Sequence, residues 1–524
     1  MKVKFYLVAL IILALNLDLL AQEKTINVEI TDPTSRGLLT GTIGVIGTAE
    51  DGYFLLRAIS KGFSLYGVGV GTKGVLVVEK FSKDYVLEKS RKIEDIPMTV
   101  MNKANDKSFE FFYQDKSKGI WLFYSDESDD KNRLFRKKLD QETLAFGKPI
   151  MVSEQPILDK KLDRRSSYSI VPSEDNSKFA VFSFVGSRSN EGSEAYVEVF
   201  DASMNSEWKM NTSIPEFQKG GQDTKLYGII KSLNSNGNVR LSNEGVFNML
   251  SKVDIVKGGN EFMHFMYSFY RGIDDPVINY LKNTDKYLLR MSLVQDKNKD
   301  VRLVGYYSND KKLRQIDGMF VQSLNPFTLA IDNEKFIPFS DENKVDFLYQ
   351  SEDYLTGKDK RKVEKGKEME VPSNTYIKSI FVNDDNSITL SSEYYQAYTY
   401  NGKLYHVNED FQFTNISENG EINWIQNFNK RQKDITLHTN GIYQMYENGT
   451  IYFIYNEPLK KEIHVGHINS DGEISSKTVL KSRKGGELKS FWLVPGTISR
   501  VGDNTYVGVA AKFFKERLVK IEIE

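Results

Sequence analysis

One glycine-rich motif has the spacing of a dinucleotide-binding loop. Gly69-Val-Gly-Thr-Lys-Gly74 matches the glycine pattern, and the chemistry it would serve is holding a pyrophosphate at the N-terminus of a following helix. The next segment, Val75-Leu-Val-Val-Glu-Lys80, has the composition of a strand and not of a helix. We therefore interpret the motif as a glycine-rich hairpin.

Two further motifs resemble parts of metal sites. His464 and His467 are three residues apart, but residues three apart in a strand point to opposite faces, so the two imidazoles cannot share one ion. Asp296-Lys-Asn-Lys-Asp300 copies the first half of a calcium loop, yet Val301 replaces the required glycine and Tyr307 replaces the bidentate glutamate. We expect no metal ion and no cofactor.

Recognisable catalytic groups are scarce. The chain has no cysteine, which excludes a thiol nucleophile, a disulfide and a thiolate metal site. It has no Gly-x-Ser-x-Gly elbow and no Walker loop. Carboxylate pairs for glycoside hydrolysis are defined in space, and among 71 Asp and Glu residues the sequence singles out none. The sequence favours a protein without catalytic activity and names no catalytic residue.

Composition indicates a large globular chain. It has 524 residues, of which 40% are hydrophobic and 12% aromatic, so there is ample material for a core. The formal net charge is −1, which argues against a nucleic-acid partner bound through bulk positive charge.

The N-terminal segment has the layout of a secretory signal peptide. Lys2 and Lys4 precede an uninterrupted apolar stretch, Phe5–Leu15, and Ala21 is a small residue suited to cleavage before Gln22. The apolar run is shorter than the roughly 18–20 residues of a membrane span, although an N-terminal anchor is the alternative. We expect residues 1–21 to be removed and the chain to be exported, to the periplasm or outside the cell, without a stable membrane span.

The rest of the chain is typical of strands. Short runs rich in Val, Ile, Tyr and Phe, such as Val301–Tyr307 and Thr450–Tyr455, recur along its length. Turn dipeptides separate them: Asp51-Gly52, Asn236-Gly237, Asn401-Gly402, Asn419-Gly420, Asn448-Gly449 and Asp471-Gly472. Asn, Asp and Gly tolerate the positive φ of type I′ turns, so these dipeptides predict hairpins. Helical periodicity is limited to Val246–Val256 and part of Asp353–Glu370.

The hairpins repeat at intervals typical of a β-propeller blade, which has four antiparallel strands in 40–50 residues. Ile-Asn-Ser-Asp-Gly-Glu-Ile at 468–474 and Ile-Ser-Glu-Asn-Gly-Glu-Ile-Asn-Trp at 416–424 resemble the outer hairpins of secreted bacterial β-propellers. Ser173–Lys178 and Asn383–Ser387 resemble the inner hairpin turns of that class. The resemblance covers most of residues 50–524 and implies an all-β propeller; it carries over no functional residue.

The blade count rests on the repeat units. Units fall near 40–98, 105–155, 165–215, 222–280, 285–335, 375–432 and 438–487, with a terminal piece at 488–524. They predict about seven blades, with eight as the alternative. Residues Thr25–Val45 are suitable partners for the last strands, because an open ring would expose sheet edges. The charged stretch 353–370 is expected to be an exposed insertion; a rival architecture splits the chain there into two domains.

Two groups of residues suit binding. Basic residues cluster at three expected junctions between blades: Arg91, Lys92, Lys430, Arg431, Arg483 and Lys484. Gathered at the mouth of a propeller, they would attract an anionic ligand or an acidic partner; alternatively, they protect exposed strand edges from association.

Tyrosines crowd one expected hairpin: Tyr394, Tyr395, Tyr398, Tyr400 and Tyr405. Tyr394 and Tyr395 are our candidates for contacts with a sugar ring or a protein, although tyrosines are also ordinary strand residues.

Together these patterns predict an exported, non-catalytic binding or scaffold propeller that recognises a protein or glycan through its loop face. Two alternatives stay open. One is an enzyme with its site in the propeller mouth, acting on a glycoside or peptide by carboxylate chemistry. The other is a structural component of an envelope assembly.

Overall fold

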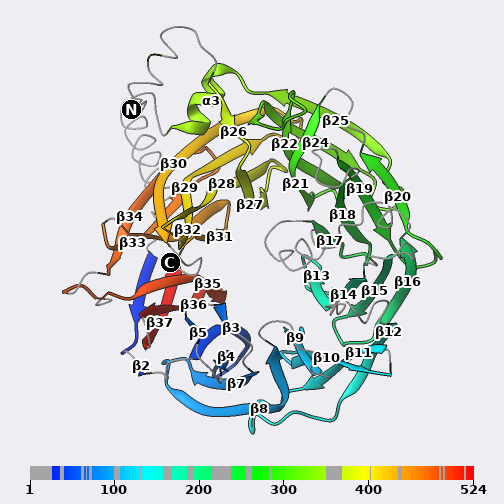
Figure 1. The fold of residues 1–524 in the computed structure, drawn as a ribbon, viewed down its shortest axis with the longest axis vertical. Coiled ribbons are helices and arrows are strands. Elements are labelled where there is room, and N and C mark those ends of the chain that lie inside the picture. Colours follow the sequence, from blue (N-terminus) through cyan, green and yellow to red (C-terminus); the bar gives the residue numbers. More distant parts are fainter. Residues whose placement is uncertain are drawn as a thin grey trace, which may run out of the picture.

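The computed structural model describes residues 26–32, 34–35, 40–60, 64–65, 68–69, 73–99, 107–129, 131–156, 168–185, 193–214, 238–254, 262–281, 286–349, 361, 369–401, 403–434, 440–458, 460–482, 485–487, 490–512 and 515–523. In this part of the chain, antiparallel four-stranded sheets follow one another around a central opening (Figure 1). The fold is an all-β propeller with eight blades.

In each blade the strands follow one another from the inside of the ring outwards (Figure 1). Blade 1 contains β3 (Thr40–Ala49), β4 (Gly52–Ser60), β7 (Lys73–Ser82) and β8 (Leu87–Thr99); blade 2 contains β9 (Lys107–Gln114), β10 (Ile120–Ser128), β11 (Lys131–Lys138) and β12 (Ile150–Pro156); blade 3 contains β13 (Tyr168–Pro172), β14 (Lys178–Val185), β15 (Ser193–Asp201) and β16 (Ser206–Ile214); blade 4 contains β17 (Val239–Leu241), β18 (Phe247–Asp254), β19 (Phe262–Phe269) and β20 (Val277–Leu281).

The second half of the ring repeats the arrangement. Blade 5 contains β21 (Tyr287–Gln295), β22 (Val301–Ser308), β24 (Gly318–Leu324) and β25 (Ile331–Pro338); blade 6 contains β27 (Thr375–Val382), β28 (Ile388–Tyr400), β29 (Lys403–Ile416) and β30 (Ile422–Asp434); blade 7 contains β31 (Ile442–Glu447), β32 (Thr450–Glu457), β33 (Glu462–Ile468) and β34 (Ile474–Lys481); blade 8 contains β35 (Trp492–Arg500), β36 (Thr505–Lys512), β37 (Lys515–Ile523) and β1 (Ile26–Ile30).

A few short elements lie outside this pattern. They are β2 (Thr34–Ser35), which pairs with β37, the β5–β6 pair (Ser64–Leu65 and Val68–Gly69), the β23–β26 pair (Gln315–Ile316 and Val371–Pro372) and helix α3 (Asp341–Leu348). The helix begins with a capping box between Ser340 and Asn343.

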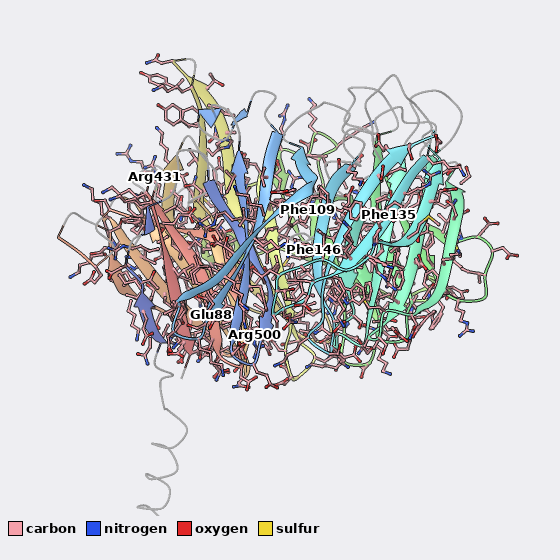
Figure 2. The ribbon with its side chains drawn as sticks, turned by 90° about the horizontal axis from the view of Figure 1, so that it is seen from below. Glu88, Phe109, Phe135, Phe146, Arg431 and Arg500 are labelled. Carbon is pink, nitrogen blue, oxygen red and sulfur yellow. The ribbon has the colours of Figure 1, made fainter. Side chains whose placement is uncertain are left out.

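The ring has two faces, which Figure 2 shows from the side. Because the strands of each blade alternate in direction, the chain leaves an outermost strand and enters the next innermost strand on one face, and the turn between second and third strands lies there too. We call this the crossover face. The turns between the first and second strands and between the third and fourth strands lie on the other face, the turn face.

The core lies between blades. Among the described residues, buried apolar side chains form eight clusters, one at each junction of neighbouring blades. Phe247 of β18, for example, packs against blade 3, and Leu250 of the same strand packs against blade 5. Both faces of a blade are therefore buried, and the apolar contacts run around the whole ring.

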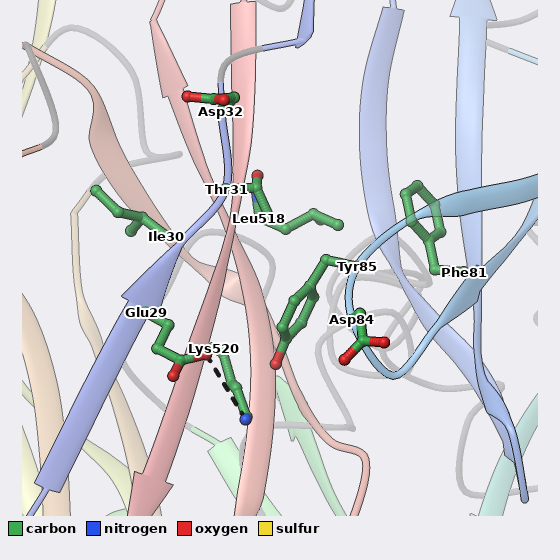
Figure 3. Close-up of a pocket in the computed structure, with 9 residues that line it drawn as sticks. All are labelled: Glu29, Ile30, Thr31, Asp32, Phe81, Asp84, Tyr85, Leu518 and Lys520. Atoms are coloured by element: carbon green, nitrogen blue, oxygen red, sulfur yellow. Dashed lines mark hydrogen bonds and ion pairs between the residues drawn. The ribbon is translucent and has the colours of Figure 1, made fainter.

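The two ends of the described chain close the ring. Strand β1 pairs with β37 in an antiparallel register that joins Ile26 to Ile523 and Ile30 to Val519. Figure 3 shows this seam, where β1 and β37 lie beside the β7–β8 turn of blade 1. The pairing completes blade 8 with strands from opposite ends of the sequence. Of the segment Thr25–Val45, which the sequence predicts to pair with the last strands, Ile26–Ile30 does so as β1. Its last residues belong instead to β3 of blade 1.

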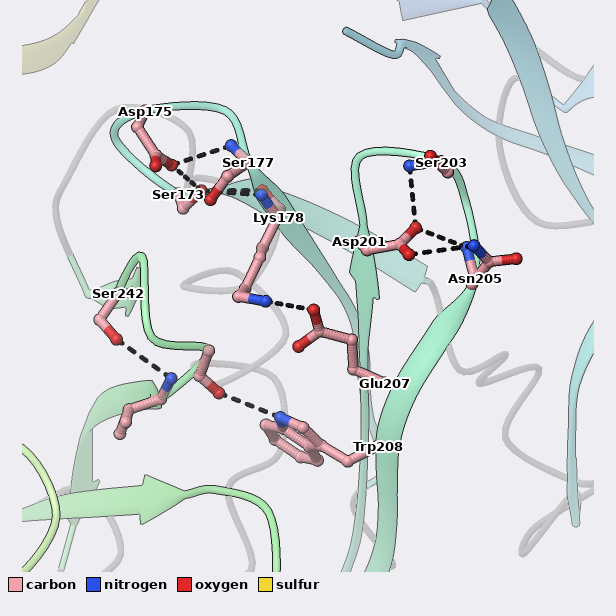
Figure 4. Close-up of polar contacts among 12 residues, drawn as sticks. Ser173, Asp175, Ser177, Lys178, Asp201, Ser203, Asn205, Glu207, Trp208 and Ser242 are labelled. Atoms are coloured by element: carbon pink, nitrogen blue, oxygen red, sulfur yellow. Dashed lines mark hydrogen bonds and ion pairs between the residues drawn. The ribbon is translucent and has the colours of Figure 1, made fainter.

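Asx turns and tryptophans stabilise the turns and fasten neighbouring blades (Figure 4). In the β13–β14 turn, the Asp175 carboxylate accepts a hydrogen bond of 2.8 Å from the backbone N–H of Ser177. The indole N–H of Trp208 in blade 3 donates to the carbonyl of Gly245 in blade 4 over 3.1 Å. The indole N–H of Trp424 in blade 6 likewise donates to a turn carbonyl of the next blade, that of Ser470 in the β33–β34 turn, over 2.9 Å.

The predicted fold class is confirmed, each of the seven repeat units corresponds to one blade, and the count is eight. One helix prediction is wrong: residues 246–256 contain strand β18. The run resembles a helix because both faces of this strand are buried, which removes the alternation of apolar and polar residues that identifies a strand. The predicted signal peptide, 1–21, and most of the predicted insertion, 353–370, lie outside the described residues.

Candidate functional site

Four of the eight predicted binding residues lie together on blade 6. Tyr394 and Tyr395 lie on β28, and Lys430 and Arg431 lie on β30. Arg91 and Lys92 lie on β8, the outermost strand of blade 1, where both are exposed. Their position in the body of an edge strand agrees with a role in protecting that edge. Arg483 and Lys484 lie outside the described residues.

The β28–β29 hairpin of blade 6 extends beyond the rest of the described strands. Its two strands have 13 and 14 residues, and they rise above the crossover face (Figure 2). The strands are joined at Asn401, which has a φ of 49° and follows the last residue of β28. Tyr400 and Leu404 at the tip are 63% and 50% exposed. Large apolar side chains are thus presented to solvent where the hairpin projects farthest.

Aromatic and basic side chains share one face of this hairpin. The register pairs Tyr398 with Tyr405 and Tyr400 with Lys403, and residues opposite each other in a sheet lie on the same face. The Tyr398 and Tyr405 rings are stacked at 5.7 Å. The Lys433 ammonium lies 5.3 Å from the first ring and 4.8 Å from the second. We call this surface the tyrosine face, and it also includes Tyr394, Arg431 and Glu409.

Tyr395 belongs to the opposite face. Its hydroxyl is hydrogen-bonded to Nδ1 of His406 at 2.7 Å, and the two rings are stacked at 6.0 Å. On its other side, Tyr376 of β27 approaches it edge-on at 6.1 Å. These contacts fix Tyr395 between the inner strand and the hairpin, so it supports the projection from within.

The base of the hairpin contains a buried ion pair. The Lys430 ammonium donates to the Glu393 carboxylate, and neither side chain is exposed at all. Lys378 of β27 reaches the same carboxylate at 2.8 Å, and the side-chain amide of Asn408 donates to it over 2.6 Å. The structure therefore places Lys430 beneath the surface, where its charge is matched by Glu393. Arg431, the next residue, is exposed and pairs with Glu409 at 2.9 Å.

Burial and charge shift the pKa values of this network. Burial alone would raise the pKa of Glu393, but the Lys430 and Lys378 ammonium groups outweigh it and hold the pKa at about 2. Burial lowers the pKa of Lys430, partly offset by Glu393. Burial and the nearby Glu409 raise the pKa of Asp410 to about 6. Glu393 is therefore ionised at neutral pH, whereas Asp410 gains or loses its proton at a pH close to neutral.

Amide side chains connect this base to the next blade. Gln432 of β30 donates to the carbonyl of Asn456 in blade 7 over 2.8 Å and accepts from the backbone N–H of Gly441 over 2.7 Å. Asn440 donates to the carbonyl of His406 over 3.3 Å. The hairpin thus rests on a hydrogen-bonded support shared by two blades, which makes its direction a fixed property of the ring.

The buried pair of Glu393 and Lys430 was not predicted from the sequence, although the order of residues 430 and 431 indicated that one of them is buried. Consecutive residues of a strand point to opposite faces, so only one of Lys430 and Arg431 could be exposed. Which of the two is buried depends on Glu393, 37 residues away along the chain.

Cavities lined by described residues also lie away from the hairpin. One, of about 460 Å³, lies at the ring seam, and its lining includes Tyr85, Asp84 and Lys520 (Figure 3). Lys520 there pairs with Glu29 at 3.7 Å.

The second cavity, of about 620 Å³, lies on the turn face between blades 6 and 7, lined by Trp424, Tyr446 and Asp385, among others. Its polar groups mostly serve the turns: Asp385 accepts from the backbone of Ser387 over 3.0 Å, and Trp424 bonds to Ser470.

Within the described ranges, no group of three His, Asp or Glu side chains is arranged to hold a metal ion. His464 is buried and bonds to Glu462 at 3.2 Å, whereas His467 lies near Ser475, 3.2 Å from its hydroxyl. The described residues also include no helix of the length and apolarity needed to cross a bilayer.

Comparison with protein-family models and with curated proteins gives no match. Solved structures with a similar fold include the polysaccharide lyase Uly1, at 9% identity over 82% of this chain and 93% of the lyase, with a TM-score of 0.37. The WD40 domain of SCAP from fission yeast matches at 10% identity over 95% of this chain and 98% of its own length, with a TM-score of 0.36. The β-propeller domain of the Trilobed protease from Pyrococcus furiosus matches at 9% identity over 79% of this chain and 99% of the domain, with a TM-score of 0.32. Similarity at this level carries no argument about what this chain binds or does.

Proposed function

We propose that this chain is an exported, non-catalytic binding propeller that docks an acidic protein partner through the tyrosine face of the blade 6 hairpin. The observation that carries the proposal is the projection of stacked tyrosines and lysines beyond the crossover face on a rigid base. Tyrosines offer large contact areas with few rotatable bonds, and they are enriched among the residues that dominate protein interfaces.

Charge favours an acidic partner. On the tyrosine face the Glu409 carboxylate is already paired with Arg431 at 2.9 Å, whereas Lys403 lies at the exposed tip and Lys433 lies over the stacked rings. A partner with carboxylates opposite these two ammonium groups would associate faster than a neutral one, and the rate would fall with added salt. A glycan is a weaker candidate, because Tyr398 and Tyr405 already stack on each other.

Site-specific photocrosslinking tests the docking site. A photoreactive phenylalanine analogue at Tyr400 is expected to give one discrete crosslinked product in an extract of the source cells. The control position is Val86, which is 61% exposed, close to the 63% of Tyr400, but lies on the turn face. The product should disappear when Lys403→Glu and Lys433→Glu are combined. Equal products from both positions, or a product that survives the charge reversal, would refute the proposal.

Export is the second part of the proposal. It rests on the basic start, the apolar run and the small residue at position 21 of the sequence. Mass spectrometry of the chain isolated from its source is expected to find an N-terminus at Gln22. A chain that retains residues 1–21 in a membrane fraction would support the anchor instead.

A further inference from the structure

One arginine of an innermost strand has no acidic partner among the residues that the structure describes. Arg290 lies on β21, the innermost strand of blade 5, and its side chain is half-buried. Its guanidinium carbon lies 3.9 Å from the centroid of the Tyr376 ring on β27 of blade 6. In the described part of the chain no carboxylate pairs with it, and its Nε has no hydrogen-bond partner. Burial lowers its pKa, and Tyr376 is the group that opposes this effect.

Other arginines of the described chain do have polar partners: Arg136 and Arg517 donate to backbone carbonyls, and two more are paired with carboxylates. Arg240 lies on β17, the innermost strand of blade 4, and donates to Glu174 over 3.1 Å. Arg302 of β22 donates to the buried carboxylate of Asp296 over 2.9 Å. A cation removed from water without a counterion is costly. The cation–π contact with Tyr376 offsets part of that cost, but it leaves the planar edge of the guanidinium without acceptors.

Backbone irregularities position this arginine. The pairing of β21 with β22 shifts register between Leu288 and Met291, so Arg290 lies within a bulge. The close approach of Gly305 permits the bulge, because a Cβ there would lie 2.4 Å from the carbonyl oxygen of Arg290. A second bulge on β27 contains Lys378. Bulges redirect side chains and are common beside binding sites.

The surrounding charge favours an anion. Lys378 and Lys430 carry two positive charges against the carboxylate of Glu393, and Asp410, which acts on Lys430, adds a negative charge above its pKa of about 6. This group is therefore positive below about pH 6 and close to neutral above it. It lies on the same blade as Tyr376, which is the ring beneath Arg290. An anion beside Arg290 would therefore meet the positive charge of the guanidinium itself, and below about pH 6 the positive potential of this group as well.

We infer that the Arg290 guanidinium, held over Tyr376 at the junction of blades 5 and 6, is a binding subsite for an oxyanion group. The guanidinium fork matches the two oxygens of a carboxylate, phosphate or sulfate and binds them through two parallel N–H···O bonds. The group can belong to a small free anion or to an acidic side chain of a docked protein. The inference does not depend on the tyrosine face.

Calorimetric titration with two probes tests the subsite. Inorganic phosphate represents the free anion, and a decamer of glutamate represents an acidic protein segment. Sodium chloride at the same ionic strength controls for general screening. We expect at least one probe to bind, and we expect Arg290→Gln to weaken it roughly 10- to 100-fold, the range for a hydrogen bond to a charged group. Phosphate binding would identify a free anion as a ligand, whereas binding of the decamer alone would identify a protein carboxylate.

Matched variants make the result specific. Arg240→Gln removes a similarly buried arginine of an inner strand that already has a carboxylate partner, and it should leave probe binding unchanged. Arg290→Lys keeps the positive charge but lacks the planar guanidinium fork, so it should bind the probe more weakly than the native chain does. This second variant guards against a folding defect in Arg290→Gln. The inference is overturned if neither probe binds, or if Arg290→Gln and Arg240→Gln bind equally well.

Discussion

The Glu393 carboxylate lies between two ammonium groups at the base of the blade 6 hairpin, and the side chains of Glu393 and Lys430 are completely buried. Glu393→Gln would leave Lys430 charged and without its counterion, which typically costs about 3–5 kcal/mol. We expect urea unfolding to show a loss of stability of this order at pH 7.

The control for this prediction is the neighbouring surface pair. Glu409→Gln removes the carboxylate that pairs with the exposed Arg431, and a surface ion pair contributes about 1 kcal/mol or less. Equal effects of Glu393→Gln and Glu409→Gln would contradict the structural importance of the buried pair. Replacing Glu393 and Lys430 together by Met should recover much of the loss, because no unpaired charge remains between them.

The raised pKa of Asp410 makes stability depend on pH. Its carboxyl has a pKa of about 6 in the folded chain against 3.8 for the ordinary group. The native state therefore holds a proton that the unfolded state releases, so this group favours folding below about pH 4 and loses that contribution as the pH rises through 6. Asp410→Asn should stabilise the chain by about 1–2 kcal/mol at pH 7.5.

Asparagine suits this position, because Asp410 has a φ of 36° and asparagine tolerates such angles. Thermal melting at two pH values checks the prediction. The difference in melting temperature between native chain and variant should be clear at pH 7.5 and vanish at pH 4. A difference that is independent of pH would mean that the carboxyl does not titrate as described.

At the scale of elements, the hairpin tip can be removed without touching its base. Ala397 pairs with His406 in the β28–β29 register. Deleting Tyr398–Tyr400 and Lys403–Tyr405 would therefore keep His406 and leave Asn401-Gly402 as a two-residue turn between paired residues. We expect the melting temperature to stay within a few degrees of the native value, because the deleted tip is largely exposed.

The same deletion separates the two binding proposals. Crosslinking to a partner should be lost when a photoreactive residue is placed at Gln396 in the shortened chain, whereas the response to the oxyanion probe should persist. Loss of the oxyanion response in a folded, shortened chain would place that site on the hairpin and not at Arg290.

How far sequence predicts an element depends on whether its signal is local. The β28–β29 and β31–β32 turns were predictable because Asn401, Asn448 and Gly449 accept positive φ, which is a property of single residues. Helix α3 was missed: its eight residues include Asp341, Glu342 and Asn343, so apolar periodicity is weak. The oxyanion subsite was also out of reach, because it joins two bulges whose positions depend on pairing between strands far apart in sequence.

At the scale of the whole molecule, the blade count was ambiguous for a physical reason. A repeat search finds units that are continuous in sequence, but blade 8 takes β35, β36 and β37 from one end of the chain and β1 from the other. Its four strands leave no continuous repeat. Blade 8 can therefore be recognised only when the N-terminal and C-terminal strands are considered together.

Ring closure by β1 can be tested with a disulfide across the seam. Asn27 lies directly opposite Glu522, and opposed residues of antiparallel strands have Cα atoms about 4.5–5.5 Å apart, within disulfide range. The chain contains no other cysteine to compete. Asn27→Cys with Glu522→Cys should form the bond on oxidation and raise the melting temperature by about 5 °C, because it links nearly the whole chain into one loop.

The increase in melting temperature should disappear when the disulfide is reduced. Glu29→Cys with Glu522→Cys is the control, because Glu29 pairs with Lys520 and lies two residues out of register with position 522. That variant should not form the bond at a comparable rate. If the control pair oxidises as readily as the matched pair, β1 slides along β37 and the seam is not a fixed part of the ring. A disulfide limited to the matched pair would mean that the eight blades form one closed ring. The blade 6 hairpin requires such a ring, because its base is hydrogen-bonded to the neighbouring blade 7.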